Sequence, residues 1–108
     1  MPELAYFAPE VLKEPDRGHD ERVGVYSVGA ILYHMLAGIP PFEGSSRQEI
    51  TRRVLNESPP ALRRINLKVS PALAKVVESA IDRSPDERPQ TLNELLEQLR
   101  KVSGGRRR

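Results

Sequence analysis

The sequence predicts an all-α fold with four helices, and three observations lead to this fold class. Apolar residues recur at spacings of three and four positions in the second half of the chain, which is typical of one buried helix face. Serine or threonine precedes several of these runs, and proline or glycine follows where a run ends. No segment alternates between apolar and polar residues as a half-buried strand would. The predicted helices cover about residues 21–37, 46–57, 70–82 and 91–102.

The first of these helices is predicted to be the central one. Asp20 can cap its start, and Gly38 with the Pro40-Pro41 pair ends it. Its apolar residues cover most of the circumference of a helical wheel. A helix that is apolar nearly all round is buried. We therefore expect the other helices to pack around residues 21–37.

The three remaining helices each begin at a capping pattern, which places a side-chain oxygen on the free N–H groups of the first turn. The apolar stripe of helix 46–57 is narrow and predicts a peripheral position, whereas the leucines of the last helix are predicted to face the core. In residues 1–12 prolines interrupt the pattern, and we predict neither helix nor strand there. The capping residues are Ser46 with Glu49, Ser70 with Pro71, and Thr91 with Glu94.

Length and composition narrow the class of protein. The 108 residues suffice for one small domain, and 38% hydrophobic with 30% charged residues suits a globular chain. The chain has no cysteine, which excludes disulfides and thiolate metal sites. A formal net charge of +2 does not indicate a nucleic-acid partner, and no membrane span or signal pattern appears. We expect a cytoplasmic domain at residues 1–103 and a flexible basic tail at 104–108.

Three motifs lead beyond the fold class. The run Tyr6-Phe7-Ala8-Pro9-Glu10 resembles the Tyr-x-Ala-Pro-Glu that closes the activation segment of serine/threonine protein kinases. Residues 24–42 resemble that family's central helix and its exit, and residues 84–89 resemble its Asp-Pro-x-x-Arg-Pro turn. The three motifs follow the family's order. The resemblance implies the C-terminal part of the helical lobe of a eukaryotic-type kinase, with a leaning toward the bacterial subgroup, beginning shortly before the Ala-Pro-Glu motif.

The resemblance also implies a structural motif made of Ala8, Pro9, Glu10 and Arg88. In kinases the glutamate of Ala-Pro-Glu binds the arginine of the later turn and so ties the activation segment to the lobe. The planar guanidinium of arginine can bind a carboxylate through two parallel hydrogen bonds. The alternative is that Glu10 and Arg88 are two solvated surface charges.

The residues that phosphate transfer needs are missing from these 108 positions. Such transfer requires a glycine-rich loop, a phosphate-directed lysine, metal-binding carboxylates and a catalytic aspartate, and none has a candidate here. Gly24 stands where kinases carry an aspartate that anchors the catalytic loop. Either that anchor lost its purpose, or Gly24 is one neutral substitution. We therefore predict that the chain is not an enzyme, binds no ATP and has no catalytic, cofactor or metal site.

The function that follows is a non-catalytic, kinase-like module for protein interaction or regulation. Its partner would be a second copy or another protein, such as a complete kinase, because part of the central helix would face water. The alternative is the substrate-binding portion of a serine/threonine kinase whose catalytic half is missing or separately encoded. Nucleic-acid binding through arginine clusters ranks last, and a gene remnant stays open. The candidate interaction surface comprises Val25, Ile31, Leu32, Met35, Ile50 and Val54.

Overall fold

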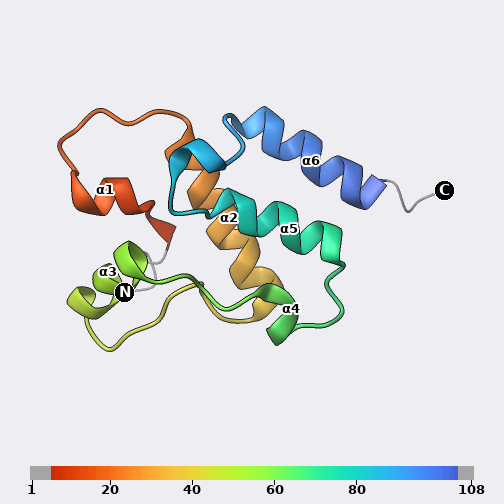
Figure 1. The fold of residues 1–108 in the computed structure, drawn as a ribbon, viewed down its shortest axis with the longest axis horizontal. Coiled ribbons are helices and arrows are strands. Elements are labelled where there is room, and N and C mark those ends of the chain that lie inside the picture. The colour runs from red at the N-terminus through yellow and green to blue at the C-terminus, as the bar shows by residue number, and fades with distance from the viewer. Residues whose placement is uncertain (1–5, 105–108) are drawn as a thin grey trace.

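The computed structural model describes residues 6–104, and every regular element in that range is helical (Figure 1). The predicted all-α fold class is confirmed. The four predicted helices correspond to α2, α3, α5 and α6, and two shorter α-helices join them. The elements in chain order are α1 (Pro9–Lys13), α2 (Arg22–Ala37), α3 (Arg47–Asn56), α4 (Leu62–Ile65), α5 (Pro71–Ala80), the 3-10 turn η2 (Pro85–Glu87) and α6 (Leu92–Gly104).

The boundaries of the long helices follow from their caps. In three of them the side-chain oxygen of the cap residue accepts a hydrogen bond from the backbone N–H three residues later. At the other end of α2, Gly38 has a φ of 83°, a left-handed conformation that glycine adopts without a steric cost. The cap pairs are Ser46 with Glu49 at 3.1 Å, Ser70 with Leu73 at 3.1 Å and Thr91 with Glu94 at 3.0 Å.

Two short helices depart from the prediction. The interpretation of residues 1–12 as neither helix nor strand is wrong for α1, which begins with Pro9 at its first position, where no N–H is needed. The other, α4, is a single turn with Leu62 buried. Helices of four or five residues contain too few apolar positions to reveal a helical period. At the C-terminus, α6 includes Gly104, which we had assigned to the tail; the rest of that tail, residues 105–108, lies outside the described residues.

The centre of the fold is α2, which α5 crosses at close range (Figure 1). Gly29 of α2 makes this approach possible. A Cβ atom added at Gly29 would lie 2.6 Å from the Cβ of Ala80 on α5, far inside van der Waals contact. Around this crossing, Tyr26, Ala30 and Tyr33 are buried. Separately, no helix in the described part of the chain has the length and apolar character needed to cross a membrane.

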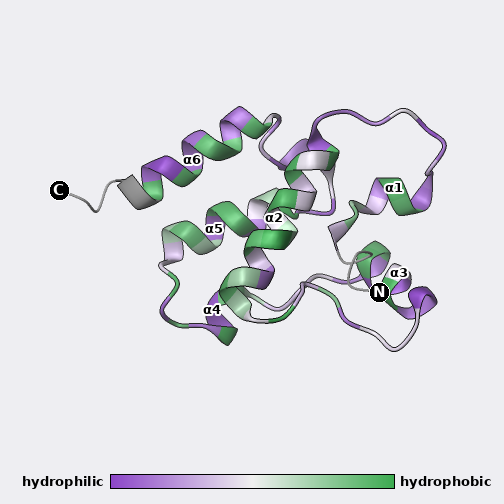
Figure 2. Cartoon of the chain, turned by 180° about the vertical axis from the view of Figure 1, so that it is seen from behind, coloured by the Kyte–Doolittle hydropathy of each residue, from purple (hydrophilic) through white to green (hydrophobic). Residues whose placement is uncertain are grey.

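One face of α2 is open, which agrees with the expectation that part of the central helix faces water. Val28, Ile31 and Met35 are 37%, 47% and 73% exposed. Their spacing of three and four positions places them on one side of the helix, and we call them the α2 strip. Figure 2 shows hydrophobic residues along α2 in the middle of the molecule. The neighbours of α2 within the chain cover its other sides.

The last helix is also less buried than its leucines suggested. Leu95 is 2% exposed and packs in a cluster with Val25 and Ala80. Leu92 and Leu96, in contrast, are 41% and 45% exposed. The helix lies along the outer side of α5 and contacts the start of α2, so only one narrow side of it meets the core (Figure 2). The expectation that its leucines all face inward is therefore wrong.

Candidate functional site

The structure brings Glu10 and Arg88 together through two hydrogen bonds. Nη1 of Arg88 donates to Oε2 of Glu10 at 2.8 Å, and Nη2 donates to Oε1 at 2.9 Å. The Arg88 side chain has no exposed surface, and that of Glu10 is 23% exposed. Glu10 lies in the first turn of α1, and Arg88 follows η2 directly. The two-pronged geometry therefore links the start of the chain to the turn that precedes α6.

Arg88 also binds three backbone carbonyl groups. Its Nε donates to the carbonyl of Asp82 at 2.7 Å, Nη1 to that of Arg22 at 3.1 Å, and Nη2 to that of Arg83 at 3.3 Å. The guanidinium lies 4.9 Å from the centre of the Tyr26 ring, within the range of a cation–π contact. One buried cation thus holds α1, the first turn of α2 and the loop after α5 in a fixed relation.

The electrostatics of this pair follow from its burial. Partial burial alone would raise the pKa of the Glu10 carboxyl, but the Arg88 hydrogen bond, a backbone hydrogen bond and the Arg88 charge outweigh that effect and lower it. Burial raises the pKa of Tyr26 to about 12. Glu10 is therefore ionised and Tyr26 neutral at physiological pH, which is the pairing that a buried guanidinium requires.

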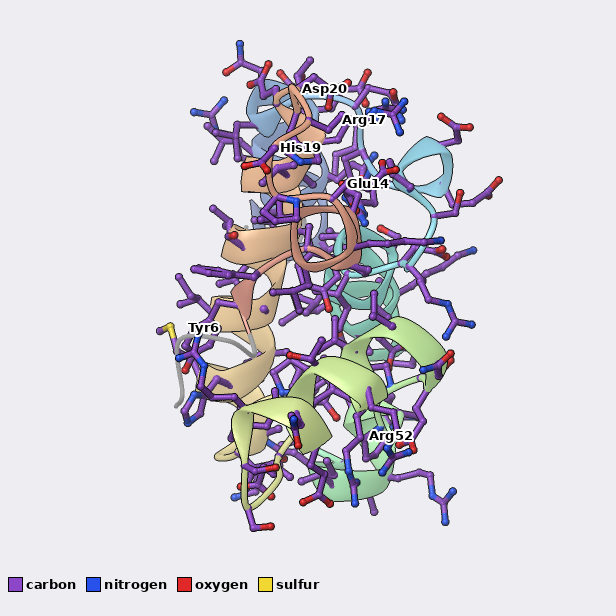
Figure 3. The ribbon with its side chains drawn as sticks, turned by 90° about the vertical axis from the view of Figure 1, so that its left-hand side faces the viewer. Tyr6, Glu14, Arg17, His19, Asp20 and Arg52 are labelled. Atoms are coloured by element: carbon purple, nitrogen blue, oxygen red, sulfur yellow. The ribbon has the colours of Figure 1, made fainter. Side chains whose placement is uncertain are left out.

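A second set of contacts holds the segment before α1 against α2. The hydroxyl of Tyr6 and Nδ1 of His34 are 2.6 Å apart, and the two rings stack with their centres 6.1 Å apart. The hydroxyl of Ser27 donates to the carbonyl of Tyr6 at 2.7 Å. Figure 3 shows Tyr6 beside α2. His34 is half-buried, and no spacing rule could pair residues 28 positions apart.

The polar residues of the loop between α1 and α2 gather at one end of the molecule (Figure 3). Arg17 pairs with Glu14 at 2.7 Å, and Nε2 of His19 lies 2.9 Å from the Glu14 carbonyl oxygen. These groups are exposed, and they form their ion pair and hydrogen bond with each other. Within residues 6–104, no cluster of three or more potential ligands could hold a metal ion.

The predicted interaction surface is divided by the structure. Val25, Ile50 and Val54 are 0%, 5% and 1% exposed, so their assignment to a surface is wrong. Val25 packs against α5 and α6, while Ile50 and Val54 pack on Phe42. Of the other three predicted residues, Leu32 is half-buried against the main core, and Ile31 and Met35 are exposed on the α2 strip.

The remaining members of the structural motif occupy buried positions. Ala8 has no exposed surface, and Pro9 is also buried at the start of α1. The Ala-Pro-Glu run, the Arg88 turn and the helices between them form one structural unit. A comparison with protein-family models finds a match to "Protein kinase domain" over residues 2–100. The chain belongs to the protein kinase family.

Individual relatives place this kinase chain among the serine/threonine kinases. It is 32% identical over 105 residues to serine/threonine-protein kinase pkn3 of Myxococcus xanthus, covering 95% of this chain and 19% of that protein. It is 38% identical over 86 residues to serine/threonine-protein kinase PknB of Mycolicibacterium smegmatis, covering 80% of this chain and 14% of that protein. It is 35% identical over 91 residues to serine/threonine-protein kinase PLK1 of Xenopus laevis, covering 84% of this chain and 14% of that protein.

The family corrects one prediction outright. The expectation that the chain is not an enzyme is wrong, because its family and these relatives are phosphate-transferring enzymes. That expectation relied on catalytic residues missing from 108 positions. The chain spans less than a fifth of the length of these relatives, so a missing motif in this segment does not decide activity.

Proposed function

We propose that this chain forms the substrate-side floor of the helical lobe of a serine/threonine protein kinase. The observation that carries the proposal is the doubly hydrogen-bonded Glu10–Arg88 pair, which lies in the two kinase motifs at opposite ends of the chain. In kinases the Ala-Pro-Glu run closes the activation segment. Here Glu10 belongs to that run, and its contacts fix where the segment ends.

In this proposal the chain contributes to phosphate transfer by holding the end of the activation segment in place. Arg88 holds α1 from one side, and the Ser27 and His34 contacts hold Tyr6 from the other. Residues 6–10 are therefore clamped between α2 and the turn before α6. A clamp of this kind keeps an adjoining substrate-binding segment in one geometry, and a displacement of about 1 Å at a reacting centre can cost on the order of a hundredfold in rate.

The α2 strip supports the same proposal. Val28, Ile31 and Met35 form an apolar face that this chain leaves open, and Phe7 is a further exposed aromatic side chain at 44%. Contiguous apolar surface of this kind is usually covered by protein. The remaining part of a kinase domain is the cover that the family membership favours.

An exchange experiment tests the proposal. Residues 6–104 replace the matching segment of PknB from M. smegmatis, and ATP-dependent phosphate transfer to a model peptide is measured. We expect the hybrid to retain activity within about tenfold of the parent, because the exchanged part positions the substrate-binding segment and supplies no reacting group. A matched hybrid that carries Arg88→Met is expected to lose at least about tenfold more. A hybrid that folds with the parent's melting temperature but transfers no phosphate would refute the proposed role.

A second candidate function is self-association through the α2 strip, and the 73% exposure of Met35 favours it. Light scattering across concentration would then show a dimer of the 108-residue chain. Met35→Glu should give a monomer, because it places a charge in the apolar contact. Leu67→Glu, a change at a residue that is 75% exposed outside the strip, is the control and should leave the dimer intact. A wild-type monomer at every concentration would rule out this candidate.

A further inference from the structure

A cavity of about 310 Å³ opens between α1, α3 and the end of α5, away from the α2 strip. Its apolar wall includes Tyr26, Phe42 and Val54, three residues that are at most 6% exposed. Residues from five separate parts of the chain thus line it. Ligand pockets in proteins usually begin at about 300 Å³, so this one suits a molecule of one ring with a short arm.

The hydroxyl group of Tyr26 is the first sign that the cavity binds something polar. Tyr26 is 1% exposed, and its ring faces the Arg88 guanidinium, yet no described residue forms a hydrogen bond with its hydroxyl. Arg53 Nε is the one fully sealed side-chain polar atom without a partner in residues 6–104, so the Tyr26 hydroxyl is not sealed. The space that Tyr26 lines is this cavity. Because Tyr26 lines this cavity and its hydroxyl is accessible there, a ligand that enters can form a hydrogen bond with it.

The charges around the cavity determine what kind of ligand fits. Its lining has three carboxylates, Glu57, Glu78 and Asp82, against one cation, Arg83. Oε2 of Glu78 accepts the backbone N–H of Leu62 at 2.7 Å, and within the described residues its Oε1 has no hydrogen-bond partner.

The neighbouring cations do not cancel this negative charge. Nη1 of Arg83 lies 3.5 Å from the carbonyl oxygens of Leu55 and Glu57, so it is directed at backbone groups. Arg52 and Arg53 lie 3.5 and 3.9 Å from Glu57, and Arg53 also pairs with Glu49 at 3.0 Å, so both are directed at carboxylates other than Glu78 and Asp82. Oδ1 of Asp82 accepts the backbone N–H of Ser84 at 2.9 Å, and Glu78 and Asp82 carry the negative charge that remains for a cation at the cavity.

We propose that this cavity binds a small organic cation, a primary ammonium group carried on an aromatic or branched apolar body. The apolar body lies against Phe42 and Val54, and the ammonium group donates to Glu78 and to the oxygen of Tyr26. All of these groups belong to the 108-residue chain. The proposal therefore stands independently of any kinase activity.

The test uses three probes of one shape and different charge: benzylamine, benzyl alcohol and benzoate. Each is titrated into the 108-residue chain while amide chemical shifts are followed by NMR. Benzylamine is expected to bind about tenfold more tightly than benzyl alcohol, because its hydrogen bonds to carboxylates are charge-assisted. Its shifts should concentrate at the cavity, and benzoate should bind most weakly. Equal binding of benzylamine and benzoate, or no shifts at the cavity, would overturn the proposal.

Two variants locate the binding groups. Tyr26→Phe removes only the hydroxyl and is expected to weaken benzylamine binding about fivefold. Glu78→Gln keeps an oxygen for Leu62 but removes the charge, and it should abolish the preference for benzylamine over benzyl alcohol. Glu97→Gln, an exposed change on α6, is the control and should alter neither value. Unchanged benzylamine binding in both folded cavity variants would contradict the assigned site.

Discussion

Arg88 illustrates how a buried charged side chain can have all of its hydrogen-bond donors satisfied. Its five donors are directed at the Glu10 carboxylate and at three backbone carbonyl oxygens, and its flat face lies on Tyr26. A buried ion pair adds little net stability compared with an apolar replacement, because desolvation offsets the attraction. Removing one partner is different, since the other charge then remains buried and uncompensated.

Glu10→Gln tests this reasoning. We expect the free energy of unfolding to fall by about 3 kcal/mol, because Arg88 keeps its charge and loses its counter-ion. Chemical denaturation followed by circular dichroism measures the change. Glu14→Gln is the matched control: its partner Arg17 is exposed, and we expect a far smaller loss because solvent screens an exposed ion pair. Equal effects of the two substitutions would contradict the assigned role of Arg88.

The same pair predicts a pH dependence. The folded state lowers the pKa of Glu10 from its ordinary value of 4.5, so the ionised form is favoured by folding. The resulting stability is fully present above pH 4.5 and is lost as the pH falls through the lowered folded pKa. The difference in unfolding free energy between wild type and Glu10→Gln should therefore shrink steadily below pH 4.5. A difference that stays constant down to acid pH would show that the carboxylate charge does not contribute.

Among the elements, the crossing of α2 and α5 sets the packing. Gly29 and Gly24 belong to the same helix, but their surroundings differ. A Cβ at Gly29 would lie 2.6 Å from Ala80, whereas a Cβ at Gly24 would meet only Leu92, at 4.0 Å. Gly29 is thus required by the helix crossing, and Gly24 is not required by packing within the chain. This leaves both sequence-based interpretations of Gly24 open.

The two glycines give opposite predictions for the same substitution. Gly29→Ala should destabilise the fold by about 1–3 kcal/mol, because the added methyl group overpacks the crossing. Gly24→Ala should stabilise it by about 0.5–1 kcal/mol, because alanine loses less backbone entropy in a helix. Thermal melting of the two variants checks both. Similar melting temperatures for the two variants would contradict the packing at the crossing.

The long helices were predictable because caps and apolar spacing act locally. Ser46, Ser70 and Thr91 mark three helix starts to within a residue. Which side of a helix is covered depends on its neighbours in space, and hydropathy does not carry that information. For this reason the assignment of Ile50 and Val54 to a surface is wrong: Phe42 covers both. Likewise, the Glu10–Arg88 pair was predicted only through the family resemblance, and its carbonyl contacts were not predicted at all.

At the scale of the whole molecule, two linkages hold residues 6–10 on the helical core. Arg88 reaches α1 from the turn before α6, and His34 reaches Tyr6 from α2. Together they fix the Ala-Pro-Glu run relative to the central helix. If the chain serves a kinase as proposed, the effect of the Glu10–Arg88 pair should appear in phosphate transfer as well as in stability.

A double-mutant cycle in the PknB hybrid tests this most directly. The kcat for phosphate transfer is measured for the hybrid, for Glu10→Gln, for Arg88→Met and for the combination of both. We predict a coupling of about 1–3 kcal/mol, because either single change already releases the Ala-Pro-Glu run and the second adds little. Fully additive effects on kcat, with a coupling below about 0.3 kcal/mol in folded variants, would show that the pair does not act as a unit in catalysis.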